Sequence, residues 1–195
     1  MGKLINAKNY SKKNNLTSFR KGNYSNYNAV GNTINYITRN TDKLEERKSE
    51  LLAWGGYGVL FLSPESAIRC FRVLQENENI NRRGGQRVIH EFFSMVNDEG
   101  IDEGAYIVSR LGTGAMVQLA YECARLYYNE GFQVVFAIHY DPGKKYHIHF
   151  VVNAISFING LKFKETLQHM GTIENAMNEI IQRYANMANT IKIAI

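Results

Sequence analysis

Apolar residues recur along this chain with two periods, one typical of helices and one typical of strands. Residues 113–128 carry apolar side chains three and four positions apart, which predicts an amphipathic helix. Residues 132–140 and 146–157 are rich in β-forming residues and flank a polar turn, which predicts a hairpin. An Asn-Gly pair follows this hairpin, so we expect residues 161–163 to return as another strand.

The rest of the chain predicts three more helices and one more strand. A short helix is expected over residues 30–37, and a Ser-Pro-Glu sequence should cap a second helix that ends near residue 77. The pattern predicts a strand over residues 86–95 and the last helix over residues 172–188. Residues 59–62 fit either a short buried strand or a loop segment.

This order of elements mixes hairpins with helices, which favours an α+β fold with a central antiparallel sheet of mixed strand order. We expect about five strands covered by helices. The length of 195 residues suits one domain spanning residues 1–195. No run of about 18 apolar residues is present, and the N-terminus lacks the apolar core of a signal peptide. We therefore expect a soluble cytoplasmic protein with no membrane contact.

The net charge of +5 is unevenly spread along the chain. Residues 1–40 hold seven basic residues and no acidic residue, and the remaining residues are net negative. The seven are Lys3, Lys8, Lys12, Lys13, Arg20, Lys21 and Arg39. Such a segment is typical of a protein with a polyanionic partner, and we expect a basic N-terminal arm over residues 1–28. On charge alone, a solvated arm without a partner fits equally well.

Three of the five histidines fall within eleven positions of the predicted hairpin. His147 and His149 are two residues apart on one strand, so their side chains leave the same face. A five-residue turn over residues 141–145 sets His139 opposite His147, and the three imidazoles converge. Three histidines bind a metal and leave open positions, as a catalytic site requires. Three imidazoles favour manganese, zinc, nickel or cobalt over magnesium, which can still serve where substrate phosphate and water supply oxygens. We expect manganese or magnesium as the ion.

The same hairpin, residues 139–141 and 146–153, resembles the three-histidine motif of the conjugative and mobilisation relaxases. These MobA/VirD-like proteins are DNA-nicking enzymes of the P class of HUH endonucleases. Residues 34–39 resemble the family's first motif, whose tyrosine is the nucleophile, and residues 87–94 resemble its middle motif. The three segments occur in the family's order and cover most of the chain.

The resemblance implies an HUH-endonuclease-like fold and strand-specific nicking at the origin of transfer of a plasmid or conjugative element. Tyr36 would attack the scissile phosphate and form a reversible 5′-phosphotyrosine link to single-stranded DNA, and the metal would stabilise the developing charge. Double- and single-stranded DNA at that origin and accessory relaxosome proteins would be the partners, in a bacterial cytoplasm. Because relaxases commonly continue into further regions, a catalytic domain cut from a longer protein is an alternative to a complete chain.

Other residues have candidate roles around this chemistry. Asp141, Glu91 and His90 are candidates to orient a metal-binding histidine. Glu91 could also be the general base for Tyr36, but only if its strand alternation points it at the metal face. Tyr24 is the rival nucleophile. The candidate DNA-phosphate contacts are Arg39, Lys144, Lys145, Arg82, Arg83, Lys12, Lys13 and Lys21, each of which would otherwise be a solvated surface cation.

Alternative functions remain open at this point. A rolling-circle replication initiator of the same superfamily normally has its tyrosine after the histidines, whereas Tyr36 precedes them. A non-catalytic DNA-binding module would keep the basic arm but would need neither Tyr36 nor the third histidine. A metal-dependent hydrolase that does not act on DNA is disfavoured by the acid-free basic segment.

Overall fold

The computed structural model describes residues 3–6, 24–41, 46–47, 50–60, 62–77, 85–96, 100–140, 145–163 and 167–191. The strands in these residues are β1 (Lys3–Asn6), β2 (Leu51–Tyr57), β3 (Val88–Ser94), β4 (Phe132–His139) and β5 (His147–Ser156). The helices are α1 (Ala29–Ile37), α2 (Pro64–Asn77), α4 (Glu103–Leu111), α5 (Thr113–Asn129) and α6 (Leu167–Thr190). None of these helices is long and apolar enough to cross a membrane.

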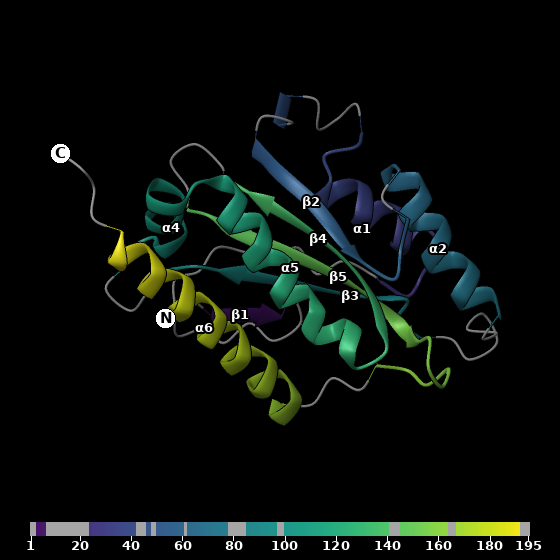
Figure 1. Ribbon diagram of the computed structural model, residues 1–195. Coiled ribbons are helices and arrows are strands. Elements are labelled where there is room, and N and C mark those ends of the chain that lie inside the picture. The colour runs from purple at the N-terminus through teal and green to yellow at the C-terminus, as the bar shows by residue number, and fades with distance from the viewer. Residues whose placement is uncertain are drawn as a thin grey trace.

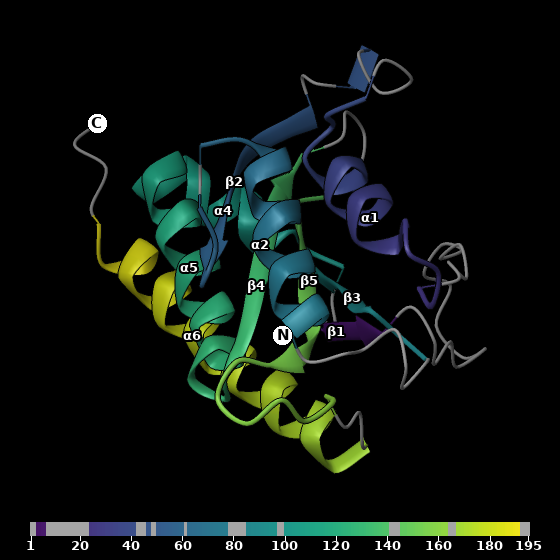
Figure 2. The same ribbon diagram turned by 90° about the vertical axis from the view of Figure 1, so that its right-hand side faces the viewer.

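The strands form one antiparallel sheet in the order β1-β3-β5-β4-β2, with helices on both of its faces. Figure 1 shows α4, α5 and α6 in front of the sheet, and Figure 2 shows α1 on the opposite side from them. The expected α+β fold with a mixed-order antiparallel sheet of about five strands is therefore confirmed.

Strand alternation divides the buried side chains into two cores. On one face, residues such as Phe93, Phe136 and Phe150 pack against α4, α5 and α6. On the other face, Val88, Val135 and Val151 pack against α1 and α2 in a smaller core. The position of a side chain in β3, β4 or β5 therefore decides whether it faces α4, α5 and α6 or faces α1 and α2.

The predicted hairpin register is confirmed. His139 pairs with His147 across β4 and β5, and the Tyr140 and Tyr146 rings stack just beyond this pair with their centroids 4.4 Å apart. Asp102 fixes the start of β5 from the neighbouring helix. One of its carboxylate oxygens caps α4 by accepting from the Ala105 amide, and the other accepts from the Tyr146 amide at 2.9 Å.

Several predicted elements were wrong or incomplete. Strand β2 and helix α4 were not predicted. Of the two interpretations of residues 59–62, the loop holds for residues 59, 60 and 62, which lie outside any strand. The last helix begins at Leu167 instead of residue 172. Residues 161–163 do not form the expected strand, because only Lys162 pairs, in an isolated β-bridge to Ile155.

The expected N-terminal arm over residues 1–28 is also corrected in part. Residues 3–6 form β1, which pairs with β3 at the edge of the sheet. Residues 7–23, which carry Lys12, Lys13 and Lys21, lie outside the described residues. Any basic arm therefore begins after a strand that belongs to the fold.

Candidate metal centre and nucleophile

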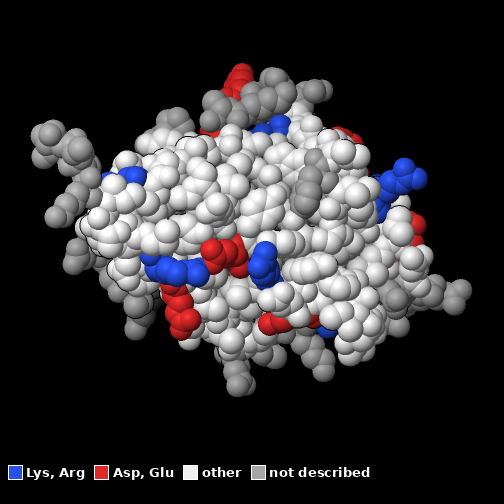
Figure 3. Space-filling view, viewed as in Figure 1, with Lys and Arg blue, Asp and Glu red and all other residues white. Residues whose placement is uncertain are grey.

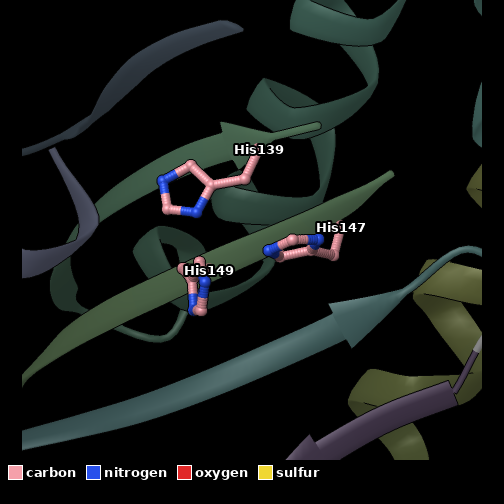
Figure 4. Close-up of side chains that lie close together, drawn as sticks. All are labelled: His139, His147 and His149. Atoms are coloured by element: carbon pink, nitrogen blue, oxygen red, sulfur yellow. The ribbon is translucent and has the colours of Figure 1, made fainter. Parts of the chain in front are cut away.

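The three hairpin histidines converge on the face of the sheet that α1 and α2 cover. One ring nitrogen from each of His139, His147 and His149 lies within 4.8 Å of the others, and all three side chains are buried. Figure 4 shows the rings turned toward one another, His139 from β4 and the other two from β5. The convergence predicted from the hairpin register is present in the fold.

Hydrogen bonds set the orientation of the two β5 histidines. The Nδ1 of His147 lies 2.9 Å from the carbonyl oxygen of Lys145, an acceptor, so Nδ1 carries the proton and Nε2 presents a lone pair. The Nδ1 of His149 lies 3.1 Å from the Nε2 of His90. For both residues Nδ1 is engaged by the protein, which leaves Nε2 as the atom that could bind a metal.

His139 has a different environment, because both of its ring nitrogens contact the chain around the end of α1. Its Nδ1 accepts a hydrogen bond from the Arg39 guanidinium at 3.1 Å, and its Nε2 donates to the carbonyl oxygen of Ile37 at 2.6 Å. A metal bound to either ring nitrogen of His139 would replace one of these two hydrogen bonds.

His90 and Tyr24 extend the site beyond the three histidines. His90 stands on β3 opposite Val151, which places it on the same face as His149. The Tyr24 hydroxyl lies 3.0 Å from His90 Nδ1, and His90 Nε2 lies 3.1 Å from His149 Nδ1. A continuous hydrogen-bonded chain therefore runs from Tyr24 through His90 to His149, as expected of a residue that orients a ligand.

Burial favours the neutral form of two of these imidazoles, those of His149 and His90. It lowers the pKa of His149 well below the usual value of 6.5, and the neighbouring histidines and Arg39 act in the same direction. Burial also lowers the pKa of His90 to about 4. Since metals bind the neutral imidazole, the fold holds His149 in its metal-binding form.

Tyr36 lies at the rim of this cluster near the end of α1. Its ring centroid is 6.0 Å from that of His149 and 6.2 Å from that of His90. The side chain is 39% exposed, so a substrate can reach it. The Arg39 guanidinium carbon lies 5.1 Å from the centre of the Tyr36 ring. Helix α1 thus brings a solvent-accessible phenol to the three-histidine cluster.

Two predicted roles are corrected by the structure. Glu91 points to the opposite face of the sheet, where it accepts a hydrogen bond from the buried Tyr127. It therefore neither orients one of the three histidines nor faces Tyr36 as a general base. Burial, together with the charge of Glu91, raises the pKa of Tyr127. Arg39 is 1% exposed and bonds His139, the Tyr36 carbonyl and Glu50, so it is not a surface contact for DNA.

The other candidate residues are placed only in part. Lys145 is exposed, and its ammonium group donates to the carbonyl oxygen of Gly100, so its role as a DNA contact stays a prediction. Asp141, Lys144, Arg82 and Arg83 lie outside the described residues.

The sequence-based interpretation did not include Phe92 in the site. It gave Tyr24 as a rival nucleophile, whereas the Tyr24 hydroxyl contacts His90 in the structure. The Phe92 ring packs 4.7 Å from the His147 ring and 5.2 Å from the His149 ring, which closes the β3 side of the cluster. A signal was present, because Phe92 and His90 are two residues apart on one predicted strand and so share a face.

The three histidines fit a divalent metal. They are buried, converge from two adjacent strands and offer neutral nitrogen donors, and two of them are already oriented by contacts at Nδ1. Such a ligand set suits manganese, zinc, nickel or cobalt, and also magnesium when oxygens from elsewhere complete its shell.

Comparison with known proteins gives a consistent result. A family model described as "Relaxase: MobA/VirD2-like, nuclease domain" matches residues 36–185, a span that starts at Tyr36 and includes all three histidines. No curated protein matches the chain.

Proposed function

The chain belongs to the MobA/VirD2-like relaxase family, and we propose that it nicks one DNA strand by attack of the Tyr36 hydroxyl on a phosphodiester. The observation that carries this proposal is the position of an exposed tyrosine 6.0 Å, ring to ring, from a member of a three-histidine cluster. The nick would lie at the origin of transfer of a plasmid or conjugative element.

The attack balances without any further reactant. The Tyr36 oxygen forms a bond to phosphorus as the bond from phosphorus to the 3′ oxygen breaks, which yields a 5′-phosphotyrosine link and a free 3′-hydroxyl. The phenolic proton leaves Tyr36, and the 3′ oxygen takes up a proton. Since one phosphoester replaces another, the reverse reaction can rejoin the strand.

Tyr36 is a better candidate for the nucleophile than Tyr24. Burial raises the pKa of the Tyr24 hydroxyl, with a contribution from the nearby Tyr36, so Tyr24 is harder to ionise than a free tyrosine. Its hydroxyl is also engaged with His90. Tyr36 is the more exposed of the two, and it stands in the segment that resembles the family's first motif.

We assign His139, His147 and His149 as ligands of a divalent metal, manganese or magnesium. When bound, the ion would stabilise negative charge on the non-bridging oxygens of the scissile phosphate. His90 fixes the His149 ring by accepting from its Nδ1–H, and His90 Nδ1–H in turn donates to the Tyr24 oxygen. Tyr24 and His90 are thus positioning residues.

The test uses single-stranded oligonucleotides that tile the DNA flanking the gene, each prepared with a 3′ and with a 5′ fluorophore. With manganese present, the 3′-labelled strand should run with the protein on a denaturing gel, and the 5′-labelled strand should be released as a shorter oligonucleotide. If the 5′ label ran with the protein and the 3′ label were released, the protein would be joined to the other fragment. That result would contradict a 5′-phosphotyrosine link.

Two matched variants distinguish the tyrosines. Tyr36→Phe should abolish the covalent adduct. Tyr24→Phe, which removes the hydroxyl that contacts His90, should only reduce it. An adduct that survives in Tyr36→Phe and disappears in Tyr24→Phe would reassign the nucleophile.

The wider setting is part of the same proposal. Residues 1–195 would form one relaxase domain in a bacterial cytoplasm, with origin DNA as substrate and accessory relaxosome proteins as partners. The lysines at 12, 13 and 21, together with Lys144, Lys145, Arg82 and Arg83, would contact phosphates.

A further inference from the structure

A groove with both polar and apolar lining runs between α1 and α2, and α1 also carries the proposed nucleophile. It has a volume of about 680 Å³ and is lined by side chains of both helices. Its polar lining residues are Asn28, Asn32, Asn35, Glu65, Arg69, Arg72 and Glu76, so two arginines and two glutamates face it together with three amides. None of them has been assigned a part in the chemistry above.

Tyr36 does not line the groove, but it follows the lining residues Asn32 and Asn35 on α1. Asn28, Asn32 and Tyr36 are spaced by four residues along α1, so they lie in one row on its surface, and all three are exposed. Eight helical residues span about 12 Å, which is the length of three to four stacked nucleotides. A strand with its scissile phosphate at Tyr36 can therefore run along this row.

The polar groups of the groove suit base edges better than a phosphate chain. Asparagine pairs with adenine, arginine with guanine, and glutamate accepts from cytosine, and all three types line the groove. A groove that only followed phosphates would be uniformly cationic. Asn28 occupies the N-cap position of α1, but its side chain makes no capping hydrogen bond.

An aromatic platform stands at the far end of the row. The side chain of Tyr27 is 51% exposed, and the guanidinium carbons of Arg72 and Arg87 lie 4.9 and 5.6 Å from its ring centre. Aromatic rings backed by arginine stack unpaired bases. At the Tyr36 end, the Asn40 side chain donates to both Asn35 and Glu65 and so links the two walls.

We propose that this α1–α2 groove holds the bases of the DNA strand on one side of the nick and reads their sequence. The inference rests on the proposed function, because it takes single-stranded DNA as the ligand. It adds the surface that makes nicking sequence-specific.

The test separates groove binding from nicking by removing metal. In EDTA, wild-type protein selects ligands from a randomised single-stranded DNA pool, and anisotropy then measures its affinity for the selected oligonucleotide. Asn32→Ala and Arg72→Ala should each weaken binding by roughly 5- to 100-fold and lose preference at one or two positions. Circular dichroism melts check that both variants fold.

Matched controls come from the opposite helix layer. Arg125 on α5 also lies over a tyrosine ring, that of Tyr57 at 5.5 Å, and Asn186 on α6 is likewise exposed. The face with α5 and α6 carries cationic and anionic groups side by side, without a continuous basic patch (Figure 3). Arg125→Ala and Asn186→Ala should therefore bind the selected oligonucleotide as wild type does.

The outcomes distinguish the two proposals. If groove variants bind weakly but wild type forms no adduct with manganese, the groove assignment stands and the nicking proposal fails. Adduct formation with an unchanged base preference in Asn32→Ala and Arg72→Ala would overturn the groove assignment alone. A wild-type pool with no enriched sequence would overturn it as well.

Discussion

Acidification should destabilise the metal-free protein through His90. In the unfolded chain this histidine takes up a proton near pH 6.5, whereas burial lowers its pKa to about 4 in the folded protein. Between these values the unfolded state binds a proton that the native state does not. Stability is therefore unaffected by His90 above pH 6.5, falls as the pH drops below it, and stops falling below about pH 4.

The size of the effect follows from this difference in pKa. The pKa of His90 differs by about 2.5 between the unfolded and folded states, which corresponds to a loss of about 3 kcal/mol of stability in full. About 2 kcal/mol of that loss is reached at pH 5. Because the His90 side chain is half-buried, solvent reduces this value, and we expect about 1–2 kcal/mol at pH 5. His149 shifts stability in the same direction, since its pKa is lowered as well.

The assay compares wild type with His90→Gln by urea denaturation in EDTA from pH 7 to pH 5. Glutamine keeps a donor and an acceptor for Tyr24 and His149 but does not titrate. The wild-type free energy of unfolding should fall more steeply with acid than that of the variant. Parallel curves would refute the reasoning, because they would mean that His90 is protonated equally in both states.

Three other substitutions test the site. Tyr36→Phe should abolish the covalent DNA adduct while it changes oligonucleotide affinity less than twofold, as measured by gel and anisotropy; undiminished adduct would contradict the assignment. His147→Ala should lower manganese affinity at least tenfold by calorimetry with little loss of fold, and wild-type affinity would exclude this residue as a ligand. Glu91→Gln should cost about 1–3 kcal/mol of stability through its buried bond to Tyr127 but leave manganese affinity unchanged. A loss of metal affinity in that variant would restore Glu91 to the site.

The histidine cluster was predictable because its geometry is local. The turn length and the two-residue alternation of a strand fix both the pairing of His139 with His147 and the shared face of His149. The position of Glu91 was not predictable in the same way. It depends on the register of β3 against β5, which are far apart in the chain, and a shift of one residue would have exchanged the faces of His90 and Glu91.

The missed strand β2 has a different physical cause. Its Gly-Gly pair resembles a chain break, but both glycines lie within the strand because neighbouring groups approach too closely for a side chain. A Cβ on Gly55 would lie 2.6 Å from the Tyr121 hydroxyl oxygen, and one on Gly56 would lie 2.0 Å from the Val134 carbonyl oxygen. Such close approaches depend on α5 and β4, which follow much later in the sequence.

Arg39 has an environment that its sequence context does not predict. It lies in an acid-free basic segment, which predicts a surface cation, yet it is buried with a φ of 54°, a conformation that costs a non-glycine residue about 1 kcal/mol or more. The guanidinium offsets this cost by bonding Glu50, the Tyr36 carbonyl and the imidazole of His139. Glycine would suit the backbone but could not connect the end of the helix that carries the proposed nucleophile to a candidate metal-binding histidine. The side chain, rather than the turn, therefore accounts for an arginine at this position.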